Sequence, residues 1–544
     1  MAQIDLSNQI YGRRKLVSNR QITGDINGDL ETVKLILSDV MSVHETNQTQ
    51  EMTLFNIFVN KTDWWSKDKV TREDINNKVS IPNAWALSRT INGYCFGEPV
   101  KFIARGSDET EGGDEQTTKQ AQVEVLSEML DRMGNHDSDI MATMCASICG
   151  VGYKLALPAN SEELELNGIP FVINTDIIMP MLAGVVYSNE SISRPVMGFV
   201  IGTYYNEDGK SDGNLYTCWT KYAQYMLKDS ESGDGYDTVK QIMDGKEVDV
   251  YQLSNSRIPL IEVERNPFRK GDWEVATELL ELKNNLISNR IDDIQQMVDY
   301  IMVLTNCAFE SEEDRNNALQ AHLLELKVSD PHNPSKAEIL KNALDQTSIQ
   351  QLADYIDLLI QECVGIPNRQ ERGGGGGDTG QAVKYRNGFR DLENNAGLII
   401  PKMDKAELQF IDLCLSYCEN VKVEGITDLK ARDVRCKFLR SFNDDALSSS
   451  QAFINLVNGG MDYVNACICS GVGTDPSEIN KKILEAWDNG TNFLSLNKAV
   501  DSAIRETTTE NAENTDANET NSQKNSENST LNAEKQTNNN GETA

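Results

Sequence analysis

The stretch that decides the organisation of this chain is residues 347–395, TSIQQLADYIDLLIQECVGIPNRQERGGGGGDTGQAVKYRNGFRDLENN. Apolar side chains recur at steps of three and four through its first part, which predicts a helix with one apolar stripe. The stripe consists of Ile349, Leu352, Ala353, Ile356, Leu359, Ile360 and Cys363. Thr347 and Gln350 have the form of a capping box at the start, and Gly365 and Pro367 end the helix.

The helix leads into a loop of unusual composition. It begins Asn368-Arg369-Gln370-Glu371-Arg372 and continues with five glycines, Gly373, Gly374, Gly375, Gly376 and Gly377. Glycine gives the backbone a wide choice of dihedral angles. Asp378 or Thr379 can cap a second helix that carries Ala382, Val383, Lys384, Tyr385, Phe389 and Leu392. Two well-specified helices joined by such a loop predict a loop that moves, or that fits against a changing surface.

The chain is acidic. Its 544 residues include 84 Asp and Glu against 51 Lys and Arg, a net charge of -33. This balance argues against a nucleic-acid binder that uses a basic patch, because affinity for phosphate depends on Lys and Arg. Two interpretations stay open: a soluble protein kept apart by like charge, or a surface past which DNA slides without sticking.

The sequence predicts neither a membrane span nor secretion. No stretch approaches the roughly 18 uninterrupted apolar residues of a spanning helix, and the first residues lack the basic and apolar regions of a signal peptide. Eleven cysteines with no Cys-x-x-Cys spacing indicate free thiols in a reducing cytoplasm. Cys145/Cys149 and Cys414/Cys418 are four apart in apolar patterns, so we expect buried small residues there rather than metal ligands.

The first 150 residues read as an arm followed by helices. Residues 1–24 are polar and basic, with Arg13, Arg14, Lys15 and Arg20. Apolar spacing predicts helices at 29–43, 53–59, 83–91, 118–134 and 138–150, and a short strand at 100–104. Trp64 and Trp65 are interpreted either as an anchor for a subunit contact or as part of a partly buried local cluster.

From residue 150 to 265 the pattern changes to short strands separated by turn signals. The expected strands are 171–174, 184–187, 197–205, 215–219 and 248–253. A β-rich module inside an otherwise helical chain indicates an α+β, mainly helical fold.

A long helix is expected next. Ile287, Ile291, Ile294, Val298 and Ile301 alternate steps of four and three. A helix over 272–305 would be about 50 Å long, and one apolar seam of that length needs neighbours along it. It is either a core helix of one domain or a helix that packs between subunits.

Residues 306–346 read as a small excursion with two strands, at 323–328 and 337–340. Its charged start contains Glu310, Glu312, Glu313, Asp314 and Arg315, and the turn between the strands contains Asp330 and His332.

Beyond the glycine loop the second helix should continue to about residue 395. Pro401 predicts a kink or a break near 397–401, because proline removes a donor and clashes with the preceding turn. An amphipathic run through Leu408, Ile411, Leu415 and Cys418 follows, then a strand pair in 421–442 and helices at 446–458, 461–470 and 476–487. From about residue 505 the polar chain is expected to be disordered.

No catalytic or cofactor site is expected. Gly375-x-Gly377-x-x-Gly380 fits the dinucleotide fingerprint, but a predicted helix precedes it where the fingerprint requires a strand. Gln381 and Ala382 stand where a phosphate-binding loop needs Lys and Ser or Thr. The four histidines, His44, His136, His322 and His332, form no His-x-x-x-His pair, so no metal site is expected either.

The order of these features resembles the portal proteins of tailed bacteriophages. Three stretches carry the resemblance: Gly93-Tyr94-x-x-Gly97-x-Pro99-Val100; Gly271-Asp272-x-Glu274 with the SNRIDDI run at 288–294; and Gly380-Gln381-Ala382-Val383-Lys384-Tyr385 with Leu392-Glu393-Asn394 after it. The series is collinear with the family from about residue 25 to 500.

The resemblance implies a domain plan with wing, stem, clip and crown around a central channel in a ring oligomer. The expected parts are an N-terminal arm (1–24), a wing (25–265), a stem helix (266–305), a clip (306–346), a second stem helix (347–364), a tunnel loop (365–380), a kinked long helix with a wing return (381–445), a crown (446–500) and a disordered acidic tail (501–544).

It also implies function and partners. A ring of twelve subunits at one capsid vertex passes double-stranded DNA during packaging and ejection, and catalyses nothing. Implied partners are the major capsid protein, the terminase large subunit and a head-completion or tail adaptor protein, with assembly in the host cytoplasm and residence in the virion. The tunnel-loop residues Arg369, Arg372, Gly373–Gly377, Asp378 and Lys384 would line the DNA channel, and the clip residues named above would form the docking surface.

Two other hypotheses stay open from the sequence. One is a nucleotide-binding enzyme built on the 373–380 loop, and the other is a monomeric helical scaffold protein.

Overall fold

The computed structural model describes residues 12–61, 64–65, 75–105, 113–206, 208–230, 235–243, 246–253, 256–298, 301–305, 311–313, 315–316, 336–340, 346–367, 389–426, 428–440, 446–461, 466–467 and 470. The chain divides into two units, Met1–Phe442 and Asn443–Ala544. In the second unit helix α12 (Ala446–Asn458) confirms the helix expected at 446–458.

The β-rich module expected between residues 150 and 265 is confirmed. Its largest sheet has the order β1-β5-β6-β7-β8-β12, with β9 paired to β8. These strands are β1 (Leu16–Ser18), β5 (Ala183–Ser188), β6 (Pro195–Tyr205), β7 (Ser211–Trp219), β8 (Ala223–Asp229), β9 (Tyr236–Thr238) and β12 (Val250–Gln252). A hairpin of β10 (Gln241–Met243) and β11 (Lys246–Val248) lies nearby in sequence.

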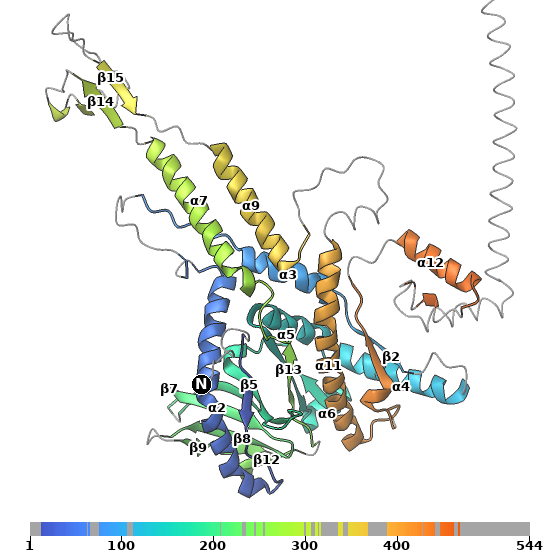
Figure 1. Ribbon diagram of the computed structural model, residues 1–544. Coiled ribbons are helices and arrows are strands. Elements are labelled where there is room, and N and C mark those ends of the chain that lie inside the picture. The colour runs from blue at the N-terminus through green and yellow to red at the C-terminus, as the bar shows by residue number, and fades with distance from the viewer. Residues whose placement is uncertain are drawn as a thin grey trace, which may run out of the picture. The chain divides into compact units, whose positions relative to one another are not determined.

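Helix α2 (Ile26–Phe58) packs its apolar stripe on one face of this sheet (Figure 1). The strands supply alternate residues, as a half-buried strand does: Ala223, Tyr225 and Leu227 of β8 all face the helix. The contacting residues of α2 are Val33, Ile36, Leu37 and Val40.

The two separate helices expected at 29–43 and 53–59 are wrong, because α2 is one helix of 33 residues. Its buried face continues through three polar residues, His44, Asn47 and Glu51, which interrupt the apolar pattern. Both polar atoms of the Asn47 amide are bonded: its Oδ1 accepts from the Arg14 N–H at 2.9 Å and its Nδ2 donates to the Arg14 carbonyl at 2.8 Å. Contacts with distant residues therefore stabilise the helix through a stretch whose sequence looks like a break.

The N-terminal segment is not a free arm where the structure describes it. From Gly12 it runs into the molecule, and β1 joins the large sheet parallel to β5. Arg13 is only 1% exposed. Residues 1–11 lie outside the described part of the chain.

A helical core lies beside the sheets. It contains α3 (Asn83–Phe96), α5 (Asn135–Cys149), α7 (Thr277–Val298), α9 (Gln346–Val364) and α11 (Phe389–Val421). The expected helices at 83–91 and 138–150 are thus confirmed. Helix α9 begins one residue before Thr347, so the expected cap lies inside its first turn. Trp65 is buried and Trp64 packs on this core, which favours the local cluster over a subunit anchor.

The long helix expected over 272–305 is wrong at its end. After a short 3-10 turn, η2 (Glu274–Ala276), helix α7 stops at Val298, and strand β14 (Ile301–Thr305) follows. β14 pairs antiparallel with β15 (Lys336–Leu340), so the second expected clip strand exists but its partner comes from the end of the supposed stem helix. Ile301, Val303 and Thr305 alternate along the chain and are residues that favour strands. The helix was predicted to reach this far because Ile301 also fits the helical spacing. The run at 323–328 lies outside the described residues.

A kink or a break is expected near residues 397–401, and of these the break is wrong, because α11 continues through Pro401. Proline at 401 leaves the carbonyl of Gly397 without its helical donor. Gly397 is exposed and no atom comes near the place of a Cβ there, so water can reach that carbonyl. Leu392, Ala396 and Met403 on either side are buried in the helical core and hold the helix together.

A second core joins the far half of α11 to several strands and to α4. It gathers β2 (Lys101–Ala104), α4 (Gly113–Arg132), β3 (Val151–Pro158), β4 (Phe171–Ile173) and β16 (Val434–Lys437). β3 also pairs with β13 (Leu260–Glu264), and a short helix α6 (Ser161–Asn167) connects β3 to β4. The local strand pair expected in 421–442 is wrong, since β16 pairs with β2 instead.

Candidate functional site: the stem helices, the loop base and the ionic centre

Helices α7 and α9 run side by side and lead to the β14–β15 hairpin (Figure 1). Two polar contacts fix their register: Lys283 of α7 pairs with Asp357 of α9, and Arg290 donates to Gln350 Oε1 at 2.7 Å. Their lower turns share the helical core through Leu280, Ile356 and Ile360. We call this α7–α9 unit the stem pair.

The end of α9 and the start of α11 are fastened together, and this junction is the base of the glycine loop. The Asn395 side-chain amide of α11 donates to the carbonyl of Val364 at 2.8 Å and to that of Gly365 at 3.3 Å. A helix leaves its last carbonyls without donors, and here a neighbouring helix supplies one. Gly365 has φ +69°, and a Cβ on it would lie 2.4 Å from Asn395 Nδ2. A larger residue here would strain the left-handed backbone and displace the Asn395 side chain.

A further contact holds the same turn of α11. Tyr94 of α3 donates its hydroxyl proton to Glu393 Oε2 at 2.5 Å, and Arg440 forms an ion pair with the other oxygen of Glu393. The end of α9 is therefore held against the first turns of α11, and residues 368–388, which connect the two helices, lie outside the described residues.

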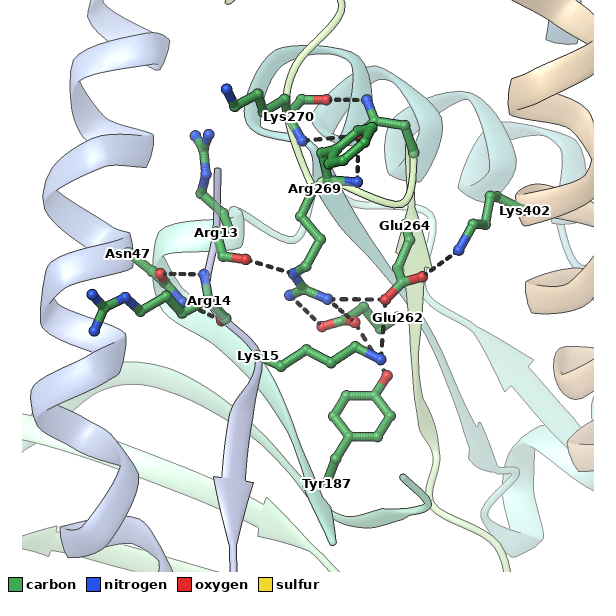
Figure 2. A network of polar contacts seen from close by, with 12 residues as sticks. Arg13, Arg14, Lys15, Asn47, Tyr187, Glu262, Glu264, Arg269, Lys270 and Lys402 are labelled. Carbon is green, nitrogen blue, oxygen red and sulfur yellow. Dashed lines mark hydrogen bonds and ion pairs between the residues drawn. The ribbon is translucent and has the colours of Figure 1, made fainter. Parts of the chain in front are cut away.

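An ionic centre connects the N-terminal segment, strand β13 and helix α11 (Figure 2). Arg269 donates to both oxygens of Glu262, at 2.6 and 3.1 Å, and to Glu264 at 3.2 Å. Glu264 also accepts from Lys402 of α11 at 2.8 Å and lies 3.4 Å from Lys15. One carboxylate thus gathers cations from three separate parts of the chain.

Electrostatics follow from this geometry. Burial by itself would raise the pKa of Glu264, but the hydrogen bond from Lys402 and the charges of Lys15 and Arg269 lower it to about 2. Burial would lower the pKa of Arg269, yet its two carboxylate partners raise it above the ordinary value. These groups stay charged at neutral pH and act as a structural tie.

The turn before the stem is fixed by a second ion pair. Arg265 binds Asp272 through Nε at 2.8 Å and through Nη2 at 2.6 Å, a two-point contact, and Asp272 also accepts from Ser147 at 2.7 Å. A Cβ on Gly150, which has φ +83°, would lie 2.2 Å from the Arg269 carbonyl, so the turn packs directly on backbone. These contacts fix the position of the turn that precedes helix α7.

A third cluster lies fully buried between β3, α5 and α11. Lys154 Nζ donates to Asp139 Oδ1 at 2.5 Å, to Glu407 Oε2 at 2.6 Å and to Asn135 Oδ1 at 3.0 Å. Burial, and then the charge of Glu407, raise the pKa of Asp139 above its ordinary value. The raised pKa favours the protonated form of Asp139, which lowers the negative charge that a dry interior must hold beside the single lysine.

These clusters show no arrangement for metal chemistry. Within the described residues no three His, Cys, Asp or Glu side chains are grouped so that they could hold a metal ion. Cys145, Cys149, Cys414 and Cys418 are buried, and burial raises the pKa of each thiol. Among the helices that the structure describes, none combines the length and apolarity needed to span a bilayer.

Comparison with known proteins decides the family. A family model described as "Phage portal protein, SPP1 Gp6-like" matches residues 43–461, more than three quarters of the chain. The chain belongs to this family of phage portal proteins. No curated protein matches it. The resemblance drawn from the three sequence stretches is confirmed, and the portal family makes the chain a structural, capsid-associated component of a virion.

The residues predicted to form the portal's channel are not tested by the structure. Arg369, Arg372, Gly373–Gly377, Asp378 and Lys384 all lie outside the described residues. So does the glycine pattern of the nucleotide-binding hypothesis. Of the clip residues, Glu312, Glu313 and Arg315 are described and exposed, and the Arg315 N–H donates to the Ser311 carbonyl at 3.2 Å as in a helical turn. Glu310, Asp314, Asp330 and His332 lie outside.

The residues that fasten this portal protein together were missed in the sequence. Asn395 carries no signal there, since an asparagine on a helix is ordinary. The strand LIEVE at 260–264 gave no signal either, because carboxylates that alternate with apolar residues are ordinary on the solvent face of a strand. Only the structure shows that Glu262 and Glu264 meet cations from elsewhere in the chain.

Proposed function

We propose that this portal protein forms a ring at one vertex of the capsid, with twelve subunits as in the family, and that double-stranded DNA passes through its centre during packaging and ejection. In this proposal the loop between α9 and α11 faces the channel. The region around the β14–β15 hairpin offers the docking platform for the terminase large subunit and for the head-completion or tail adaptor protein.

The observation that carries the proposal is a second apolar stripe on α9. Leu352, Tyr355, Leu359 and Cys363 recur at steps of three and four, and Leu352 and Tyr355 are 48% and 56% exposed in the single chain. At 3.6 residues per turn this stripe lies about 200° around the helix from Gln350 and Asp357, which contact α7. A stem pair with apolar residues on its outer side fits a ring in which the next copy of the chain covers them.

The loop base supports the channel part of the proposal. Asn395 fastens the end of α9 to α11, so the two helices on either side of the glycine-rich segment are held together. Its arginines, Arg369 and Arg372, suit transient contacts with phosphates, and such contacts are weak and salt-sensitive. The acidic excess of the chain, 84 against 51, favours a duplex that slides rather than binds.

Assembly is tested by particle mass and by negative-stain images of the purified full chain. Wild-type protein should form rings with a central opening, and the double variant L352D/Y355D should give single subunits with unchanged circular dichroism. A matched control is Leu166→Asp, since Leu166 is 82% exposed on the short helix α6 and should leave rings intact. Solitary wild-type particles of 60.6 kDa, with no opening, would contradict the proposal.

The channel assignment is tested separately by R369A/R372A. This variant should assemble normally but alter DNA packaging or retention, with an effect that shrinks as salt rises. Its control removes two exposed cations of the wing, R194A/K210A, and should behave as wild type. If R369A/R372A fails to assemble, the arginines belong to an interface and not to the channel.

A further inference from the structure

Three polar residues of α7 are buried on one side of the helix where apolar residues would be ordinary. Asn284 and Asp292 are each 1% exposed and Ser288 is 5% exposed. They follow one another at steps of four, so they form a straight row along the helix. A buried polar row needs partners, because an unpaired polar group in the interior is costly.

The partners are backbone groups of residues 75–81, a segment with neither helix nor strand structure that lies alongside α7. The Ile81 N–H donates to Asn284 Oδ1 at 3.1 Å, the Val79 N–H to Ser288 Oγ at 3.0 Å, and the Asn77 N–H to Asp292 Oδ1 at 2.8 Å. Every second residue of the segment therefore meets every fourth residue of the helix, and the two run in opposite directions.

The spacing explains why this pairing works. Four residues of a helix rise about 6 Å, and two residues of an extended chain advance about 6.6 Å. The two repeats differ by only about 0.6 Å per step, so three successive rungs stay within hydrogen-bonding reach. Side chains of one helix can thus bind the N–H groups of an extended backbone, without a neighbouring strand.

One end of the row adds a side-chain requirement. The Asn77 carboxamide donates to Asp292 Oδ1 at 2.6 Å and to Gln295 Oε1 at 2.8 Å. These two contacts select one register, because shifting the segment by two residues would put another side chain opposite Asp292. The row therefore prefers an extended peptide that carries a carboxamide at its first rung.

The opposite side of the segment is held by the end of α2. Ser80 Oγ donates to Asn60 Oδ1 at 2.5 Å and accepts from the Trp65 indole N–H at 3.2 Å. The Asn60 amide also donates to the Ser80 carbonyl at 3.0 Å. Residues 75–81 consequently lie between the end of α2 and helix α7, and contact both.

We propose that the row Asn284, Ser288 and Asp292 is a binding site for an extended polypeptide backbone, filled in this chain by residues 75–81, and that it ties the stem helix to the wing. The three side chains accept hydrogen bonds from alternate backbone N–H groups, and the carboxamide of Asn77 sets the register. This inference concerns contacts within one chain, so it holds or fails independently of the DNA-channel proposal.

The test is amide hydrogen exchange of the full-length protein, resolved to single residues. In the wild type the amides of Asn77, Val79 and Ile81 should exchange slowly although they belong to no helix or sheet. Ser288→Ala should speed exchange at Val79, and Asn284→Leu should speed it at Ile81, each about tenfold or more, as expected for loss of one hydrogen bond. Each substitution should speed exchange only at the amide that it contacts. A general loosening of the fold would instead speed exchange at all three amides.

Conservative and neighbouring variants complete the test. Ser288→Thr keeps the hydroxyl and should restore the protection of Val79, and Asn289→Ala, an exposed neighbour on α7, should leave all three amides as in the wild type. Fast exchange at the three amides in the wild type, or an equal effect of Asn289→Ala and Ser288→Ala on Val79, would overturn the proposal.

Discussion

Lys154 Nζ lies 2.6 Å from Glu407 Oε2, and neither side chain is exposed to solvent. The two residues are 253 positions apart, one on β3 and the other on α11. Asp139 completes the cluster from α5. An interior ion pair of this kind is expensive to break, because the partner left behind keeps its charge without compensation.

Lys154→Met should therefore destabilise the chain strongly, by about 3–5 kcal/mol, because it leaves two buried carboxyl groups without a cation. Asp139→Asn should cost less than about 1 kcal/mol, since the asparagine resembles the protonated carboxyl that the raised pKa of Asp139 indicates. Denaturant unfolding at one fixed protein concentration and neutral pH measures both. Equal losses in the two variants would contradict the protonated form of Asp139.

Lys402→Met should weaken the contact between α11 and β13 by about 1 kcal/mol at pH 7, a modest figure because Glu264 is partly exposed. The pKa of Glu264 is lowered to about 2, so its carboxylate stabilises the fold above about pH 4.5, and this stabilisation is lost as the pH falls toward 2. The stability difference between wild type and variant should thus be full above pH 4.5 and shrink below it. Lys405→Met, an exposed lysine on the same helix, is the control and should show no such pH dependence.

His44→Leu should make the protein less sensitive to mild acid. Burial lowers the pKa of His44 from 6.5 to about 4, and its Nε2 has no hydrogen-bond partner. The unfolded chain therefore binds a proton more readily than the folded one, so wild-type stability falls as the pH drops from about 6.5 to about 4, by roughly 3 kcal/mol at most. Unfolding free energies of both proteins at pH 7.5 and 4.5 give the comparison. An unchanged acid sensitivity in the leucine variant would contradict the assignment.

Gly365→Ala should cost about 1–2 kcal/mol from the left-handed backbone alone, and more from the contact with Asn395 Nδ2. Asn395→Ala removes that obstacle, so the double variant should be less destabilised than the sum of the two single variants. Gly397→Ala is the matched control on α11: no atom lies near its Cβ position, and it should stabilise the helix by about 0.5–1 kcal/mol. Simple additivity in the cycle would mean that the two residues do not contact each other.

Local pattern predicted much of this fold. The apolar stripe through Ile356 and Ile360, followed by Gly365, specified helix α9 and its end almost to the residue. Turn signals between short β-branched runs indicated the sheet module of residues 150–265. In each case neighbours along the chain carry the information, because helix and strand periods are local properties.

Predictions failed where distant partners override the local pattern. His44, Asn47 and Glu51 looked like a gap between two helices, yet the backbone of Arg14 and the ring of Phe199 complete the buried face there. Pro401 looked like a break, but the core on both sides holds α11 continuous. Ile301 fitted the helical period, and its pairing with Leu340 made it a strand instead.

The sequence by itself determined the family and the order of the main helices and of the sheet module, because these depend on period, turn chemistry and collinear motifs. Only the tertiary structure decided which charges meet. Glu264 joins Lys15, Arg269 and Lys402, and Asn395 closes on Gly365, through contacts between residues far apart in the chain. No local pattern encodes such pairs, since their energy arises from burial and distance after folding.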